Sequence, residues 1–153
     1  MKIRLATAAD IPFLMSLARP SATAAQWTEP QYELALQQRL ILVAEEASTT
    51  TTADSGSGLL GFLVARHVAP EWELENIVVA ARTRRNGLAT QLLNALLARA
   101  RETHSEAVFL EVRESNTAAR TLYEKAGFEQ TGRRAAYYTN PAEDAILYRR
   151  RLP

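Results

Sequence analysis

The chain has 153 residues, a formal net charge of +1 and no cysteine. This length is enough for one domain with a substantial core, and we expect residues 1–153 to form a single domain. The balanced charge argues against a nucleic-acid partner held by bulk electrostatics, and the lack of cysteine excludes disulfides, thiolate metal sites and a cysteine nucleophile. We also expect a soluble, cytoplasmic protein that does not act at a membrane, because residues 1–5 lack the apolar core of a signal peptide and no apolar run approaches ~20 residues.

The N-terminal segment predicts a strand followed by a helix. Residues 3–6 have strand character, and Thr7 is a plausible N-cap for a helix that extends to Ala18. Pro20 should end this helix, because proline cannot continue the hydrogen-bond pattern.

A second helix is predicted from the capping-box pattern of Thr28 and Gln31. Residues 40–45 then resemble a strand, and residues 48–58, rich in threonine, serine and glycine, predict a mobile hairpin loop with nothing to bury. The apolar residues that the second helix should turn toward a core are Tyr32, Leu36 and Leu40.

The middle of the chain predicts two strands, a long helix and a third strand. The strands cover residues 59–68 and 73–80, joined around Pro70, and a further strand covers residues 107–113. The helix between them, residues 87–103, has an apolar stripe made of Leu88, Leu92, Leu93, Leu96, Leu97 and Ala100.

The C-terminal part predicts a helix over residues 116–126, ended by Gly127, and two closing strands over 128–134 and 145–151. Strands and helices alternate without an internal repeat. This order predicts an α/β fold, a mixed and mostly antiparallel sheet with helices on both faces.

The turn before the long helix has the features of an anion-binding site. It follows an apolar strand and carries Arg84, Arg85, Asn86 and Gly87, with Ala89 in the first helical turn. The first N–H groups of a helix have no intrahelical partner, and the helix dipole favours negative charge there. An ordinary tight turn with solvated arginines is the alternative interpretation.

Glu111 is a carboxylate within an otherwise apolar strand. The two-residue period places it on the face opposite Leu110 and Val112, beside Phe109 and Arg113. It can be a partly exposed carboxylate paired with Arg113, or a general base that takes a proton from an attacking amine.

One face of the helix that follows carries a stripe made of Asn116, Ala119, Arg120 and Tyr123. A phenol with an ordinary pKa near 10 is protonated at neutral pH and can donate a proton to a departing thiolate. The alternatives are a helix cap for Asn116 and a core aromatic for Tyr123.

Three aromatic residues, Trp27, Tyr137 and Tyr138, lie in predicted loops that would suit peptide recognition, although such residues often fill a core instead. His67 and His104 end regular elements and favour surface roles. No spacing of ligating residues predicts a metal site.

Several segments together resemble the GNAT (Gcn5-related N-acetyltransferase) family. The turn at residues 84–89 is similar to the family's Gln/Arg-x-x-Gly-x-Gly/Ala signature, and the likeness runs from about residue 73 to residue 152, with a shorter one at residues 26–29. The segments that most resemble the RimI type, ribosomal-protein alanine N-acetyltransferases, are Asn76-Ile77-Val78-Val79, Leu110-Glu111-Val112-Arg113, Ser115-Asn116, Leu122-Tyr123-Glu124, Ala126-Gly127-Phe128, Tyr137-Tyr138 and Glu143-Asp144-Ala145.

This resemblance implies the GNAT fold, acetyl-CoA as co-substrate and no metal. It implies that Glu111 is the proton acceptor, that Tyr123 is the general acid, and that Asn116 contacts the pantetheine arm beside the small Ala119. The strand edge at Ile77, Val78 and Val79 would pair with pantetheine, and the pyrophosphate would bind at Arg84, Arg85, Asn86, Gly87, Leu88, Ala89 and Thr90.

The function that the resemblance implies is acetyl transfer from acetyl-CoA to an amine by direct attack. The implied acceptor is a peptide or protein N-terminus, in particular an alanine α-amine of a small-subunit ribosomal protein, bound near Trp27, Tyr137 and Tyr138. The alternatives are an acetyltransferase of a small-molecule amine and a non-catalytic acyl-CoA-binding module. A nucleotide-binding module is the weakest alternative, because the chain has neither Gly-Lys-Ser/Thr nor a Rossmann glycine triplet.

Overall fold

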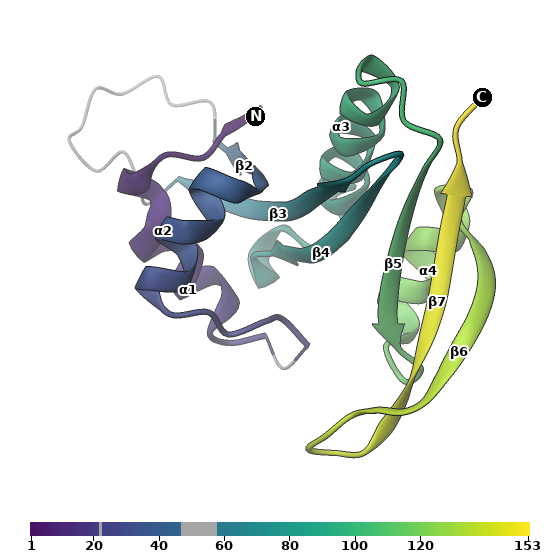
Figure 1. The fold of residues 1–153 in the computed structure, drawn as a ribbon. Coiled ribbons are helices and arrows are strands. Elements are labelled where there is room, and N and C mark those ends of the chain that lie inside the picture. Colours follow the sequence, from purple (N-terminus) through teal and green to yellow (C-terminus); the bar gives the residue numbers. More distant parts are fainter. Residues whose placement is uncertain (22, 47–57) are drawn as a thin grey trace.

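The computed structural model describes residues 1–21, 23–46 and 58–153, which form one seven-stranded mixed sheet (Figure 1). The strand order is β1-β2-β3-β4-β5-β7-β6, and every neighbouring pair is antiparallel except β4 and β5. The strands are β1 (Lys2–Leu5), β2 (Leu40–Glu45), β3 (Leu59–Val68), β4 (Glu71–Val79), β5 (Ala107–Arg113), β6 (Glu129–Tyr138) and β7 (Glu143–Arg151). The predicted loop at residues 48–58 lies outside the described residues, apart from Gly58.

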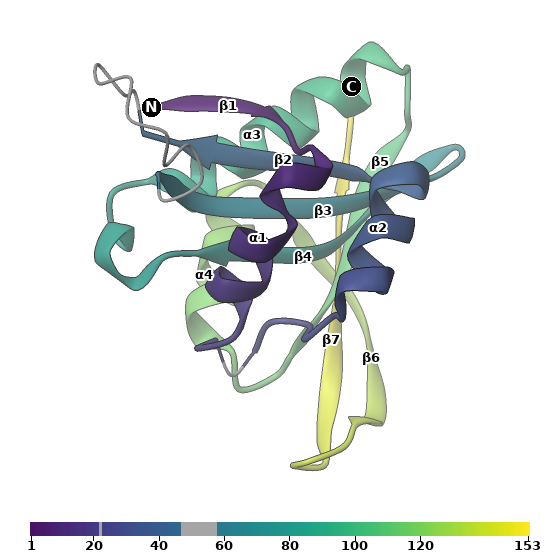
Figure 2. The same ribbon diagram turned by 90° about the vertical axis from the view of Figure 1, so that its left-hand side faces the viewer.

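Four α-helices cover the two faces of the sheet (Figure 2): α1 (Ile11–Ala18), α2 (Glu29–Gln38), α3 (Leu88–Glu102) and α4 (Thr117–Lys125). On one face, α1 and α2 bury Leu14 and Tyr32 against Phe62. On the other face, the predicted leucine stripe of α3 is fully buried, and Tyr123 of α4 joins the same core. The predicted α/β architecture, with helices on both faces of a mixed sheet, is therefore confirmed. No helix in the described part of the chain is both long and apolar enough to cross a membrane.

The predicted cap at Thr28 is confirmed, whereas the prediction of Thr7 as the N-cap of the first helix is wrong, because Asp10 holds that position in α1. Thr28 and Gln31 form a reciprocal capping box, in which the Thr28 N–H donates to Gln31 Oε1 at 2.7 Å and the Gln31 N–H donates to Thr28 Oγ1 at 3.4 Å. Thr7 precedes a 3₁₀ turn, Ala8–Asp10, which leads into α1. The expectation that Leu40 extends the buried face of α2 is wrong, because Leu40 already belongs to β2 and packs against the α3 side of the sheet.

The most consequential irregularity is a β-bulge at Glu75 in β4. Val64 of β3 pairs with Asn76, whereas the next residue, Ala65, pairs with Leu74, so Glu75 is an extra residue without a partner in β3. The bulge reverses the alternation of side chains along β4: Leu74 packs on the α3 side, whereas Val78, four residues later, packs on the α1–α2 side.

The parallel pairing of β4 with β5 ends just before this bulge. Residues 71–73 pair with residues 107–109, and beyond them the two strands diverge (Figure 1). The sheet is therefore split at its centre, and the split opens toward the ends of β4 and β5.

The C-terminal hairpin is longer than predicted. β6 continues to Tyr138 rather than Arg134, across a register irregularity in which Ala136 has a positive φ of 51°. The prediction of Tyr137 and Tyr138 in a loop is therefore wrong, because the irregularity lets β6 resume pairing with β7 at Tyr138 and Glu143.

Asp10 links β1 to the start of α1, and its replacement tests this link. Its carboxylate accepts hydrogen bonds from the Arg4 guanidinium at 2.8 and 3.0 Å and from the Thr7 N–H at 2.8 Å. The bond from Arg4 is the largest cause that holds the pKa of Asp10 below its usual value. A lowered carboxyl pKa stabilises the folded state above the unfolded pKa, and this contribution is lost as pH falls through the folded pKa.

We therefore expect Asp10→Asn to lower the free energy of unfolding at pH 7 by about 1–3 kcal/mol. The difference from the parent should shrink below about pH 4, the ordinary aspartate value. Thermal or urea unfolding at both pH values measures this, with Glu33→Gln on the exposed face of α2 as the control. A difference that stays constant down to pH 2 would contradict the assignment.

Candidate active site

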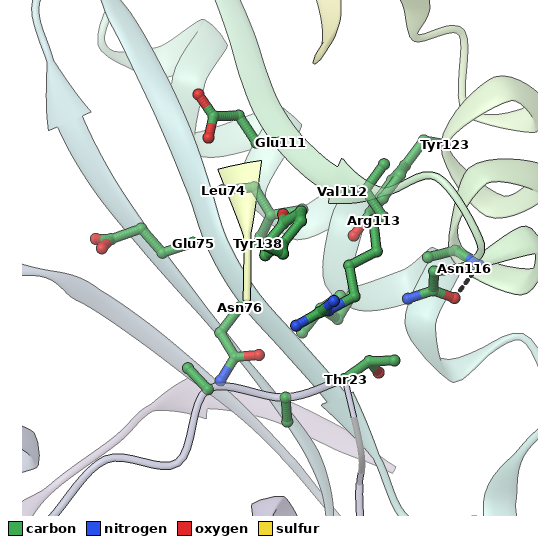
Figure 3. A pocket seen from close by; sticks show the side chains of 14 residues that line it. Thr23, Leu74, Glu75, Asn76, Glu111, Val112, Arg113, Asn116, Tyr123 and Tyr138 are labelled. Carbon is green, nitrogen blue, oxygen red and sulfur yellow. Dashed lines mark hydrogen bonds between the residues drawn. The ribbon is translucent and has the colours of Figure 1, made fainter. Parts of the chain in front are cut away.

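The split between β4 and β5 leads into two adjoining cavities of about 330 and 720 Å³. The smaller one lies between the diverging strands and the loop before α2 (Figure 3). The larger one lies between the end of β4, the turn before α3 and the side of α4. The two cavities share four lining residues, which makes them two parts of one cleft: Thr23, Ile77, Asn116 and Ala119.

The larger cavity collects nearly all residues that were predicted to bind a cofactor. Asn86 is the exception, and its backbone N–H donates to the Thr83 carbonyl within the turn. The predicted residues that line this cavity are Ile77, Val78, Val79, Arg84, Arg85, Gly87, Leu88, Ala89, Thr90, Asn116 and Ala119.

The turn before α3 leaves the start of that helix open to the larger cavity. Gly87 is the N-cap of α3 with a left-handed backbone (φ 76°), and it has no side chain that could occupy the first N–H groups. A Cβ atom at Gly87 would meet no atom within 4 Å, so the glycine serves the backbone conformation and keeps the space above it open. With Arg84 and Arg85 beside it, this helix start can bind phosphate oxygens.

The smaller cavity brings together Glu111 and Tyr123, the two predicted catalytic residues. Glu111 lies on β5 and faces away from the α3 core, as the strand period predicted. Its carboxylate pairs with Arg134 Nε at 3.3 Å, and a hydrogen bond to it raises the pKa of Tyr137. The alternative pairing of Glu111 with Arg113 is not found, because Arg113 instead contacts Glu143 at 3.3 Å.

Tyr123 lies at the inner wall of the smaller cavity and is 6% exposed. Its ring packs against Phe128 and Tyr148, with centroids 5.8 and 6.3 Å away. Burial raises the pKa of the Tyr123 phenol above its ordinary value, so the hydroxyl is protonated at neutral pH. A buried phenol at a cavity wall is a hydrogen-bond donor that can become a proton donor.

Asn116 performs the capping role and lines the cleft at the same time. Its side-chain oxygen accepts a hydrogen bond from the Ala119 N–H at 3.2 Å, which caps α4. Figure 3 shows the side-chain nitrogen on the other side of the amide, toward the cavity. The cap fixes the orientation of a side chain that reaches both parts of the cleft.

The three predicted substrate-binding aromatics are in different environments. Tyr138 lines the smaller cavity, and the guanidinium of Arg113 stacks on its ring, 4.4 Å from the centroid (Figure 3). Tyr137 is exposed and lies edge-on to Tyr138 at 5.0 Å. Trp27 does not line either cavity, because it packs on Tyr32 of α2 at 5.4 Å and supports the α1–α2 core.

Sequence reasoning missed several lining residues. Glu75 reaches the smaller cavity at the bulge, which no sequence pattern reveals. On α4, Arg120 was expected to share the face of Asn116 and Tyr123, but it does not line the cleft. Its guanidinium instead donates to the Glu114 carbonyl and the Tyr148 hydroxyl. The larger cavity is lined instead by a second stripe at helical spacing, a signal that could have been found: Ala118, Thr121, Leu122 and Lys125.

The histidines and acidic residues give no metal centre among the described residues, where no group of three or more candidate ligands is found. His67 stacks on Trp72 with centroids 4.7 Å apart.

Comparison with known proteins identifies the family. The model of the Acetyltransferase (GNAT) family matches residues 11–128, which include α3, β5, α4 and most of the cleft. The chain belongs to this family. The expected GNAT fold is thereby confirmed.

Named relatives support the predicted likeness to the RimI type. A [Ribosomal protein bS18]-alanine N-acetyltransferase of Haemophilus influenzae is 37% identical over 92 residues, 58% of this chain and 62% of that protein. N-alpha-acetyltransferase RimI of Mycobacterium tuberculosis is 36% identical over 102 residues, 64% of this chain and 63% of that protein. The matches thus span less than two thirds of the length of these relatives.

The fold is also similar to solved structures over nearly its whole length. The crystal structure of the ribosomal-protein-S18-alanine N-acetyltransferase from Escherichia coli has a TM-score of 0.83 and 27% sequence identity, and the match covers 98% of this chain and 92% of that one.

Proposed function

We propose that this protein transfers the acetyl group of acetyl-CoA to the N-terminal α-amine of a protein, and that its natural acceptor is a small-subunit ribosomal protein with an N-terminal alanine. The observation that carries the proposal is the two-part cleft, with an open helix start at one end and Glu111 with Tyr123 at the other. The names of the relatives from Haemophilus influenzae and Escherichia coli support the choice of acceptor.

The larger cavity is the donor site in this proposal. The pyrophosphate of acetyl-CoA binds the N–H groups at the start of α3 and the arginines of the turn. The pantetheine arm extends along Ile77, Val78 and Val79 toward Asn116, which brings the thioester to the junction of the two cavities. A non-catalytic binding module would have no use for an acid and a base at this junction.

The smaller cavity is the acceptor site. The amine nitrogen attacks the thioester carbonyl carbon, the new C–N bond forms, and the C–S bond breaks. Glu111 accepts the proton lost by the amine, and the Tyr123 hydroxyl donates a proton to the departing thiolate of coenzyme A. Exchange with solvent then restores both side chains, and the products are the N-acetylated chain and free coenzyme A.

The donor site can be tested at Gly87. Gly87→Val should weaken coenzyme A binding by about tenfold or more, because a β-branched residue disfavours the left-handed backbone that opens the start of α3. Isothermal titration measures the affinity, and circular dichroism checks the fold. Gly132→Ala on β6 is the matched control, since a Cβ there meets only an ordinary contact at 4.0 Å. Unchanged affinity in a folded Gly87→Val protein would remove the donor from this turn.

The general acid can be tested at Tyr123. Tyr123→Phe should lower kcat by about two to four orders of magnitude while changing KM little, because only proton donation is lost. Tyr32→Phe is the control, since the buried Tyr32 hydroxyl has no hydrogen-bond partner in the described structure and does not line the cleft. A loss below about threefold, with chemistry limiting the rate, would leave Tyr123 a core aromatic.

The acceptor can be tested with a peptide that has a free N-terminal alanine and an internal lysine. An α-amine has a pKa of about 7.7–8.0 against about 10.4 for lysine, so the neutral nucleophile is several hundred times more abundant at the terminus near pH 7. We expect mass spectrometry to place the acetyl group on the α-amine. A control peptide with a blocked terminus should not react. Acetylation mainly on lysine, or turnover with small amines only, would contradict the proposed acceptor.

A further inference from the structure

The tip of the β6–β7 hairpin is tied to the cleft by Glu143, the first residue of β7. Its carboxylate contacts the Arg113 guanidinium at the end of β5, with Arg113 Nη1 3.3 Å from Glu143 Oε2. Its other oxygen, Oε1, accepts a hydrogen bond from the Ser115 N–H, just before α4. One side chain therefore joins the hairpin to the connection between β5 and α4, about thirty residues earlier in the sequence.

Arg113 extends this connection to the hairpin itself. Its Nη1 atom also donates to the Pro141 carbonyl at 3.2 Å, and its Nη2 atom donates to the Thr139 carbonyl at 3.4 Å. The same guanidinium lies over the ring of Tyr138 at 4.4 Å, on the wall of the smaller cavity (Figure 3). The position of the Tyr138 ring thus depends on a cation whose own position depends on Glu143.

The Glu143–Arg113 pair is well suited to this task because it is sheltered. The side chains are 15% and 22% exposed, and the hydrogen bonds from Ser115 hold the pKa of Glu143 below its usual value. The carboxylate is therefore ionised at neutral pH, and its hydrogen bonds are charge-assisted.

A second ion pair on the same hairpin provides a comparison. Arg133 of β6 contacts Glu114 at 2.7 Å, but these side chains are 44% and 43% exposed and neither lines the cleft. Such a pair contributes little in water. Of the Glu143–Arg113 and Arg133–Glu114 pairs, only the first is connected to a cavity wall.

We propose that Glu143 is a positioning residue for the acceptor: through Arg113 it holds Tyr138 as the outer wall of the acceptor cavity, and so it sets the affinity for the acceptor without touching it. This inference rests on the proposed function. It predicts an effect confined to one substrate, because the donor cavity has neither Glu143, Arg113 nor Tyr138 in its lining.

The test measures KM for the alanine peptide, KM for acetyl-CoA and kcat in variants of the full chain. Glu143→Ala should raise the peptide KM by about tenfold, and Glu143→Gln by about threefold, because glutamine still accepts from Ser115 but loses the charge that faces Arg113. The KM for acetyl-CoA and kcat should stay within about twofold. Glu114→Gln is the matched control and should leave all three values within about twofold.

A double-variant cycle tests the route through Tyr138. In a Tyr138→Leu background, Glu143→Ala should add less than about twofold to the peptide KM, because the ring that it positions is gone. Full additivity, an unchanged peptide KM in folded Glu143→Gln, or an equal rise in both KM values would each overturn the inference. Failure of the parent itself to acetylate the peptide would refute the proposed acceptor instead, and the same KM comparison on whichever amine the parent uses would then decide the role of Glu143.

Discussion

The cleft depends on one constraint, the early end of the pairing between β4 and β5. Two parallel strands normally stay about 4.8 Å apart along their length, which leaves no room between them for a ligand. Here the pairing stops at Glu73 and Phe109, and the extra residue at Glu75 bends β4 away from its neighbour. Backbone groups and side chains that would otherwise be buried in a continuous sheet then line a cleft.

The bulge also determines which side chains face the two parts of the cleft. Because it reverses the alternation along β4, Asn76 and Ile77 follow it as lining residues, and Ile77 lies where the two cavities meet. The two predicted catalytic side chains come from the diverging β5 and from α4 behind it. Glu111 is partly exposed, whereas Tyr123 is buried, and burial raises the pKa of its phenol above the ordinary value. In the proposed reaction, this difference in environment suits Glu111 to accept a proton and Tyr123 to donate one.

Candidate-site residues could be predicted from the sequence where their placement depends on the spacing of nearby residues. Short patterns and the family resemblance predicted the turn at residues 84–90, the position of Glu111 on its strand and the helix that presents Asn116 and Tyr123. The structure brings these residues, except Asn86, into one cleft. By contrast, the positions of Glu75 and Arg113 at the cleft depend on contacts between segments that are far apart in the sequence. A bulge is a relation between two strands, and the partner of Arg113 is thirty residues away on another strand. Trp27 was misplaced for a related reason, since composition does not distinguish an aromatic that packs on Tyr32 from one that faces a groove.

The shared walls of the two cavities have a consequence for ligand design. Thr23, Ile77, Asn116 and Ala119 contribute to both cavities, so the two cavities adjoin. Under the proposed function, a single molecule that joins a coenzyme A moiety to a short peptide through a bridging carbonyl would occupy both parts of the cleft at once. The link would make the second binding step intramolecular, so such a compound would bind more tightly than either half alone, provided that its linker matches the distance across the junction.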